Sequence, residues 1–129
     1  MDSGNRAVGF RELKVWRLSR DLAVDIGNLC DFGGVSRSRV LSDQMQRSSI
    51  SIPSNIAEGN DRSSNRDTLR FLIIARGSLA ELQTQLDISL GRRLIDHAQH
   101  KSLEERCNEV GRMLSGLIQF RRKREAADT

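Results

Sequence analysis

Few residues of this chain have the types and spacing that catalysis or metal binding requires. His97 and His100 are its only histidines, three positions apart, and Cys30 and Cys107 are its only cysteines, far apart in the sequence. A closed zinc site needs four ligands, and neither cysteine lies near the histidines in the chain. No serine has a histidine in a context typical of a catalytic triad, and no phosphate-binding glycine motif is present. We therefore expect no enzymatic activity, no metal, no cofactor, and two buried thiols.

The basic residues carry a clearer signal. Lys and Arg number 21 against 17 Asp and Glu, which gives a formal charge of +4, and all but three of the basic residues are arginine. The guanidinium of arginine can donate two parallel hydrogen bonds to a phosphate or a carboxylate, so this composition favours nucleic acid or an acidic partner. Three groups would neutralise phosphates without reading base sequence: Arg11, Lys14 and Arg17; Arg62, Arg66 and Arg70; and Arg121, Arg122, Lys123 and Arg124.

Each basic group also has a simpler interpretation as a solvated helix face. Glu58 and Arg62, four residues apart, fit an ion pair on such a face. We favour nucleic-acid binding because three separate groups share one sign of charge. With one Trp, four Phe and no Tyr, the chain offers little surface on which unpaired bases could stack, so a single-strand stacking platform is not expected.

The composition places these groups on a small helical protein. At 129 residues the chain fits one domain, 1–129, with a single core. Charged residues make up 29% and hydrophobic residues 37%, which argues against a disordered chain and against a membrane protein. Proline, aromatic and β-branched residues are sparse, so few strands are expected. No apolar run approaches the ~20 residues of a spanning helix, and residues 1–10 lack a signal pattern, so we expect a cytoplasmic protein without a membrane partner.

Apolar residues that recur at steps of three and four predict four amphipathic helices. Capping boxes at Ser64–Asp67 and Ser102–Glu105 mark the starts of the third and fourth helices. Pro53 falls inside the second helix and should kink it, and Gly59 fits a left-handed cap at its end. The prediction is an all-α, antiparallel up-down four-helix bundle, with helices at about 10–29, 38–58, 64–91 and 102–121 and a basic flexible tail at 121–129.

Some apolar residues lie outside the expected core rows. Phe71, Ile73 and Ile74 point away from the row of the third helix, and Trp16 flanks the row of the first. Helices that are hydrophobic on several faces are normally covered on several faces. A broad core in a thick bundle would cover these residues, but we favour a subunit interface. The chain is therefore expected to self-associate.

Four ordered segments carry a family resemblance: Phe10–Trp16, Ser51–Gly59, Arg70–Leu72 with Ala75–Leu86, and Gly111–Ile118. The second segment reads Ser-Ile-Pro-Ser-Asn-Ile-Ala-Glu-Gly and is the most distinctive. Together they resemble the bacterial 23S rRNA-intervening sequence proteins over about Phe10 to Ile118. A more distant similarity is to the accessory proteins of diversity-generating retroelements.

The resemblance implies a bundle that assembles into a ring-shaped oligomer, typically a homopentamer, with no known enzymatic activity. The retroelement relatives bind nucleic acid and a reverse transcriptase. We therefore expect a homo-oligomer that binds nucleic acid, above all structured RNA, through its arginine-rich faces. The alternative is a scaffold that docks a polymerase such as a reverse transcriptase, or another protein. The signature residues are expected to be structural, satisfying backbone and arginine donors where the second helix meets the third: Pro53, Asn55, Glu58 and Gly59.

Overall fold

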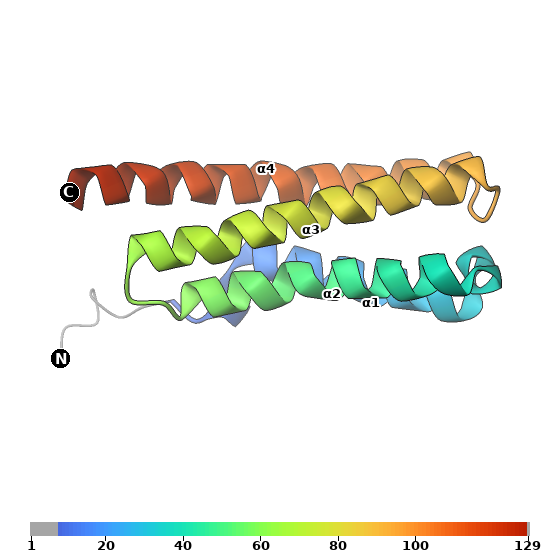
Figure 1. Ribbon diagram of the computed structural model, residues 1–129, viewed down its shortest axis with the longest axis horizontal. Helices are drawn as coiled ribbons and strands as arrows, with labels where there is room; N and C mark the ends of the chain where they lie inside the picture. Colours follow the sequence, from blue (N-terminus) through green and yellow to red (C-terminus); the bar gives the residue numbers. More distant parts are fainter. Residues whose placement is uncertain (1–7, 129) are drawn as a thin grey trace.

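The computed structural model describes residues 8–128, and every regular element in that range is helical. The elements are shown in Figure 1: η2 (Phe10–Glu12), α1 (Lys14–Phe32), η3 (Gly34–Arg37), α2 (Arg39–Asn60), α3 (Asn65–Gly91) and α4 (His97–Asp128). The predicted all-α class is confirmed. None of these helices is both long enough and apolar enough to cross a membrane.

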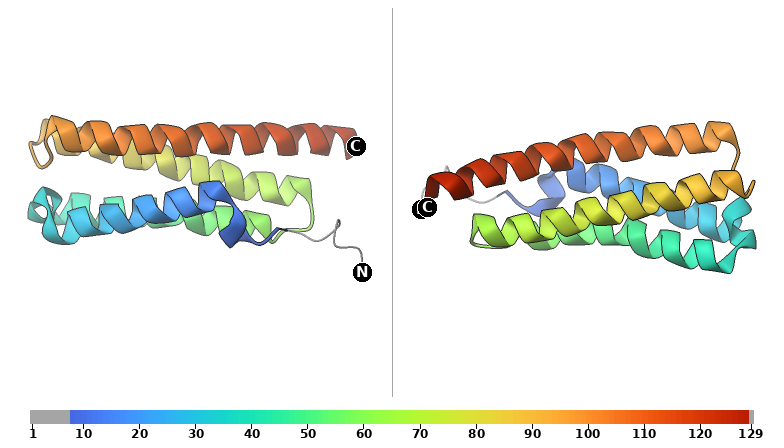
Figure 2. Two further views of the ribbon diagram at one scale, coloured as in Figure 1. Left: turned by 180° about the vertical axis from the view of Figure 1, so that it is seen from behind. Right: turned by 45° about the horizontal axis from the view of Figure 1, so that its top comes forward.

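Consecutive helices run in opposite directions and pack beside one another (Figures 1 and 2). α4 also contacts α1, so the four helices surround one core. The starts of α1 and α3 and the ends of α2 and α4 therefore lie at the same end of the bundle. Side chains spaced three and four residues apart fill the core, and the most deeply buried include Leu22, Ile26, Met45, Ile52, Ile56, Leu82, Leu86, Leu114 and Ile118.

The chain enters the bundle through a turn rather than through a longer first helix. Phe10–Glu12 forms the 3₁₀ turn η2, and Leu13 is extended, with φ −75° and ψ 124°. The α-helix therefore begins at Lys14, not at residue 10, and it continues to Phe32, beyond the predicted residue 29. Packing of apolar rings accounts for the turn, because it brings Phe10 edge-on to Trp16 with 5.1 Å between the ring centroids.

The junction between α2 and α3 differs in one respect from the prediction. α2 is a single helix with Pro53 in its interior, and the kink expected there stays a prediction. Gly59 is not a left-handed cap, because no glycine in residues 8–128 has a positive φ and the helix continues past it to Asn60. α3 is capped as predicted by Ser64, whose hydroxyl accepts a hydrogen bond of 3.1 Å from the backbone N–H of Asp67.

α4 is longer at both ends than the sequence indicated. A capping box of Asp96 and Gln99 starts it: the Gln99 N–H donates to Asp96 Oδ1 at 2.7 Å, and the Asp96 N–H donates to Gln99 Oε1 at 2.9 Å. The predicted box at Ser102–Glu105 lies inside the helix. Residues 121–128 continue the helix in place of the predicted flexible tail, because Arg, Lys, Glu and Ala are strong helix formers.

Candidate nucleic-acid interface

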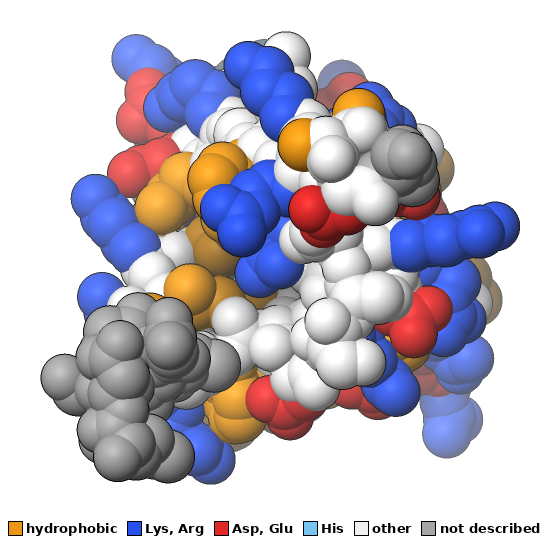
Figure 3. All heavy atoms as spheres, turned by 90° about the vertical axis from the view of Figure 1, so that its left-hand side faces the viewer, with side chains coloured by type: hydrophobic (Ala, Val, Ile, Leu, Met, Phe, Trp, Pro, Cys, Tyr) orange, Lys and Arg blue, Asp and Glu red, His pale blue; other side chains and the backbone are white. Residues whose placement is uncertain are grey.

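The bundle brings the three predicted basic groups to one end. Residues 8–17 lead into α1, residues 58–70 join α2 to α3, and residues 121–128 end α4. Because consecutive helices run in opposite directions, these segments meet at the left-hand end of Figure 1 although they are far apart in the sequence. We call the three segments together the basic end. Figure 3 looks onto it and shows Lys and Arg side chains around its rim, with hydrophobic side chains between them.

The basic end holds the whole net charge of the described residues. It contains ten Lys and Arg residues and six Asp and Glu residues, whereas residues 18–57 and 71–120 contain ten of each sign. Among the ion pairs of residues 8–128, only that of Arg62 with Glu58, with an N···O distance of 3.2 Å, neutralises a basic residue of this end. A surplus of positive charge confined to one end creates a potential that attracts polyanions.

Two of the predicted basic residues lie over the same aromatic ring, that of Phe71. The guanidinium carbons of Arg62 and Arg70 are 4.6 and 4.7 Å from the centroid of the Phe71 ring. Phe71 is only 8% exposed, and these two arginines help to cover it, so its expected role at a subunit interface stays a prediction. Its position off the core row of α3 does not by itself require a second subunit, because arginine stems and guanidinium groups also cover apolar surface.

The other basic residues of this end differ in whether their side chains already have a partner within the chain. Arg121 donates a hydrogen bond of 2.9 Å to Asn65 Oδ1, and Arg17 donates one of 3.0 Å to the backbone carbonyl of Arg11. The Arg124 guanidinium lies 5.5 Å from a ring centroid one turn earlier in α4. Four exposed basic residues of this end make no ion pair, side-chain hydrogen bond or aromatic contact with any described residue: Lys14, Arg66, Arg122 and Lys123. These four are the best placed to contact phosphates.

A groove between α3 and α4 extends the basic surface along the bundle. Its volume is about 740 Å³, and its walls carry Arg76 from α3 and Arg112 and Arg122 from α4. Gly111 and Gly116 also line it, so a ligand could approach the α4 backbone closely there. Because Arg122 belongs to the basic end, the groove and the end form one continuous surface. Sequence reasoning missed Arg76 and Arg112, since only the pairing of two antiparallel helices brings them to the same groove.

The signature residues Asn55 and Glu58 make polar contacts near the junction of α2 and α3. Asn55 Nδ2 donates to the carbonyl of Ser51 at 2.8 Å and to its hydroxyl at 3.0 Å, and this hydroxyl lies 2.8 Å from the hydroxyl of Ser78 on α3. The carboxylate of Glu58 forms an ion pair with the guanidinium of Arg62. These contacts support a structural role for Asn55 and Glu58, with Asn55 acting as a donor and not as an acceptor.

The remaining residues that were expected at a subunit interface are partly exposed. Ile73 and Ile74 on α3 are 41% and 44% exposed. Trp16 is half-buried and lines a groove of about 470 Å³ between α1 and α2. Val24 and Ile50 also line this groove, and they are 57% and 55% exposed. An apolar groove of this kind is typical of a surface that contacts another protein.

The cysteines and histidines lie outside the basic end, although Cys107 also lines the α3–α4 groove. Both cysteines are free and buried, as predicted. Burial raises the pKa of both thiols, that of Cys107 to about 12, so neither is a reactive thiolate at neutral pH. Both histidines lie in α4 rather than in a link before it. Within residues 8–128, one group of side chains is arranged closely enough to hold a metal ion: Asp87, His100 and Glu104.

The fold and its charge distribution define a class of small four-helix bundles with one strongly basic end. The chain belongs to the family of 23S rRNA-intervening sequence proteins, whose model matches residues 11–116, as the sequence motifs indicated. The structure is also similar to the crystal structure of a protein of unknown function from the S23 ribosomal protein family of Bacteroides thetaiotaomicron VPI-5482. The TM-score is 0.74, with 28% sequence identity over 81% of this chain and 97% of that one. No curated protein matches the sequence significantly.

Proposed function

We propose that this protein binds nucleic acid, above all structured RNA, through the basic end and the α3–α4 groove, and that it is not an enzyme. The observation that carries the proposal is the confinement of the net positive charge to one end, while the rest of the described chain is balanced. Phosphates are the groups that such a surface neutralises. Arginine supplies most of the charge, and its planar fork suits pairs of phosphate oxygens.

The aromatic side chains favour a folded ligand over an unpaired strand. Phe32 and Phe120 are the exposed aromatic residues in the described part of the chain, and Phe32 lies at the far end of α1 from the basic end. A stacking platform for successive bases needs several exposed rings along one basic path. A basic surface without such rings suits double-helical RNA, which proteins recognise mostly through its shape and its backbone.

The proposal is tested by the binding of a fluorescent RNA hairpin, followed by anisotropy over a series of salt concentrations. The triple variant Arg66→Glu, Arg122→Glu, Lys123→Glu reverses three exposed charges of the basic surface. It leaves Arg62 and Arg70 in place, since their loss would also uncover an aromatic ring. If each side chain meets one phosphate, the slope of log K against log salt should become shallower by about 3.

A matched control changes the net charge by the same amount elsewhere. Arg39, Arg47 and Lys101 are exposed, lie outside the basic end and do not line the α3–α4 groove. Their triple replacement by Glu should leave most of the affinity and nearly the whole salt slope. Equal losses in the two triple variants would show that only the total charge matters, and would contradict a defined binding surface.

We further propose that the chain self-associates, and that the assembly is the ring, typically a homopentamer, that the family resemblance implies. The apolar groove between α1 and α2 supports self-association, because a second copy would cover Val24 and Ile50. Val24→Glu with Ile50→Glu should lower the molar mass measured by light scattering after size exclusion. Val40→Glu is the control, since Val40 is 72% exposed and does not line this groove. A monomeric wild type would contradict the proposal.

The same groove favours one alternative function, that of a scaffold which docks a polymerase such as a reverse transcriptase, or another protein. An acidic or apolar partner would then use the surfaces that we assign to RNA and to self-association. RNA binding that disappears at ~0.15 M salt would favour the scaffold, because a nonspecific electrostatic contact is lost steeply with salt. Binding that persists at this salt and depends on Arg66 and Arg122 would favour the nucleic-acid function.

A further inference from the structure

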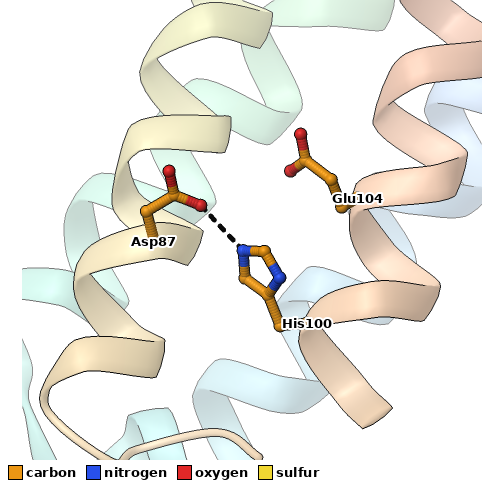
Figure 4. A group of neighbouring side chains, drawn as sticks. All are labelled: Asp87, His100 and Glu104. Carbon is orange, nitrogen blue, oxygen red and sulfur yellow. Dashed lines mark hydrogen bonds and ion pairs between the residues drawn. The ribbon is translucent and has the colours of Figure 1, made fainter. Parts of the chain in front are cut away.

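Three side chains of metal-ligating types converge between α3 and α4, away from the basic end. Asp87 comes from the last turns of α3, and His100 and Glu104 lie four residues apart on one face of α4. One ligand atom of each residue lies within 4.8 Å of those of the other two. Figure 4 shows the three side chains directed toward one another, with 2.7 Å between His100 Nε2 and Asp87 Oδ1.

Glu104 provides an independent indication that a cation belongs at this place. Its Oε1 accepts a hydrogen bond of 3.0 Å from Gln83 Nε2, whereas its Oε2 is buried and has no hydrogen-bond partner. It is the one side-chain atom of residues 8–128 in this condition. A buried carboxylate oxygen without a partner is destabilising, and a bound cation would remove that penalty.

We propose that Asp87, His100 and Glu104 bind a divalent cation and that Zn²⁺ is the best match. One imidazole nitrogen with carboxylate oxygens is a donor set that zinc accepts, whereas Mg²⁺ and Ca²⁺ prefer oxygen ligands alone. Two carboxylates also balance the charge of the ion. Three protein ligands leave a coordination position for water, and the Asp87 side chain is 71% exposed, so the ion can enter from solvent.

Binding requires only a local exchange of hydrogen bonds. His100 Nε2 faces Asp87 Oδ1, so the cation takes the place of the proton between these two atoms. The neutral imidazole then carries its proton on Nδ1. The ion joins the last turns of α3 to the first turns of α4, and because this arrangement exists only in the folded chain, binding stabilises the folded state.

The test uses the chain after treatment with a chelator, titrated with ZnCl₂ in a calorimeter and then unfolded by heat with and without Zn²⁺. The wild type should bind one Zn²⁺ per chain and unfold at a higher temperature when Zn²⁺ is present. His100→Gln and Glu104→Gln each remove one ligand. Each should weaken binding by about 10-fold or more and abolish the zinc-dependent rise in Tm.

His97→Gln is the matched control, because His97 lies on the same helix, is exposed and is not part of the group. This variant should keep the affinity of the wild type. Circular dichroism of the metal-free variants separates loss of the site from loss of the fold. Absence of one-to-one binding, or an equal loss in His97→Gln, would overturn the proposal and leave His100 and Asp87 as a hydrogen-bonded contact between two helices.

Discussion

The hydroxyl of Thr68 donates a hydrogen bond of 2.9 Å to the backbone carbonyl of Gly59, and it joins the first turn of α3 to the last turn of α2. The two helix backbones approach closely at this point. A Cβ atom added to Gly59 would lie 3.1 Å from Phe71 Cβ and 3.3 Å from the carbonyl oxygen of Thr68. The close packing of the two helices, rather than a left-handed conformation, therefore favours glycine at position 59.

We expect Gly59→Ala to lower the free energy of unfolding by about 1–3 kcal/mol, because both neighbouring atoms are held by the α3 backbone and the helix must shift. Gly77→Ala is the matched control, since its added Cβ would meet no atom within 4 Å apart from its chain neighbours and the adjacent backbone of its own helix. That variant should be more stable by up to about 1 kcal/mol, because alanine favours the helix over glycine. Urea denaturation measures both changes. A stabilised Gly59→Ala protein would show that α3 accommodates the added atom without strain.

The contact between Arg70 and Phe71 should be measurable as a coupling energy. A double-mutant cycle of Arg70→Leu with Phe71→Leu is expected to give a coupling of about 0.5–1 kcal/mol, because an exposed guanidinium over an aromatic ring contributes that much. Arg66 lies one turn earlier on α3 and makes no ring contact, so Arg66→Leu with Phe71→Leu should give none. Equal coupling in the two cycles would show a general effect of charge rather than stacking.

The Cys107 thiol predicts how the stability of the protein depends on pH. Burial, with a smaller contribution from the charge of Glu104, raises the pKa of this thiol from 9.0 to about 12. The unfolded chain therefore loses the thiol proton at a lower pH than the folded chain. The resulting stability is fully present below about pH 9 and is lost as the pH rises towards 12, by at most about 1.4 kcal/mol for each pH unit.

Cys107→Ala removes this titration, so the free energy of unfolding of the variant should fall less steeply than that of the wild type between pH 9 and pH 11. Urea denaturation at several pH values gives the two slopes. Cys30 is present in both proteins, so the raised pKa of its thiol affects both curves equally. Parallel curves would mean that the Cys107 thiol already ionises in the folded state.

The helices could be predicted from the sequence because side chains at steps of three and four share one core. The boundaries of the helices were harder to predict, since more than one local sequence pattern could mark the same helix start. Asp96–Gln99 and Ser102–Glu105 both match a capping box, and sequence alone does not choose between them. Leu94 and Ile95 are buried directly before the first box, so the chain turns into the bundle there and the helix starts at once.

The basic groups could also be predicted, but their gathering at one end depends on the alternating direction of the helices. The α3–α4 groove was not predictable for the same reason, because Arg76 and Arg112 line one groove only after the two helices pair. His100 and Glu104 are spaced for one helix face, yet Asp87 joins them only across the helix pair. Side chains on one helix can be placed from their spacing, whereas side chains on two helices need the register between them.

The confinement of positive charge to one end also makes the molecule an electric dipole. Because the helices alternate in direction, each end of the bundle carries two helix N-termini and two helix C-termini, and their backbone dipoles largely cancel. The side chains of the basic end therefore set the direction of the dipole. The field of a polyanion would rotate the protein before contact, so that it arrives end-first and a larger share of encounters is productive. The opposite end, with Asp87 and His100, would then point away from the polyanion and stay open to solvent.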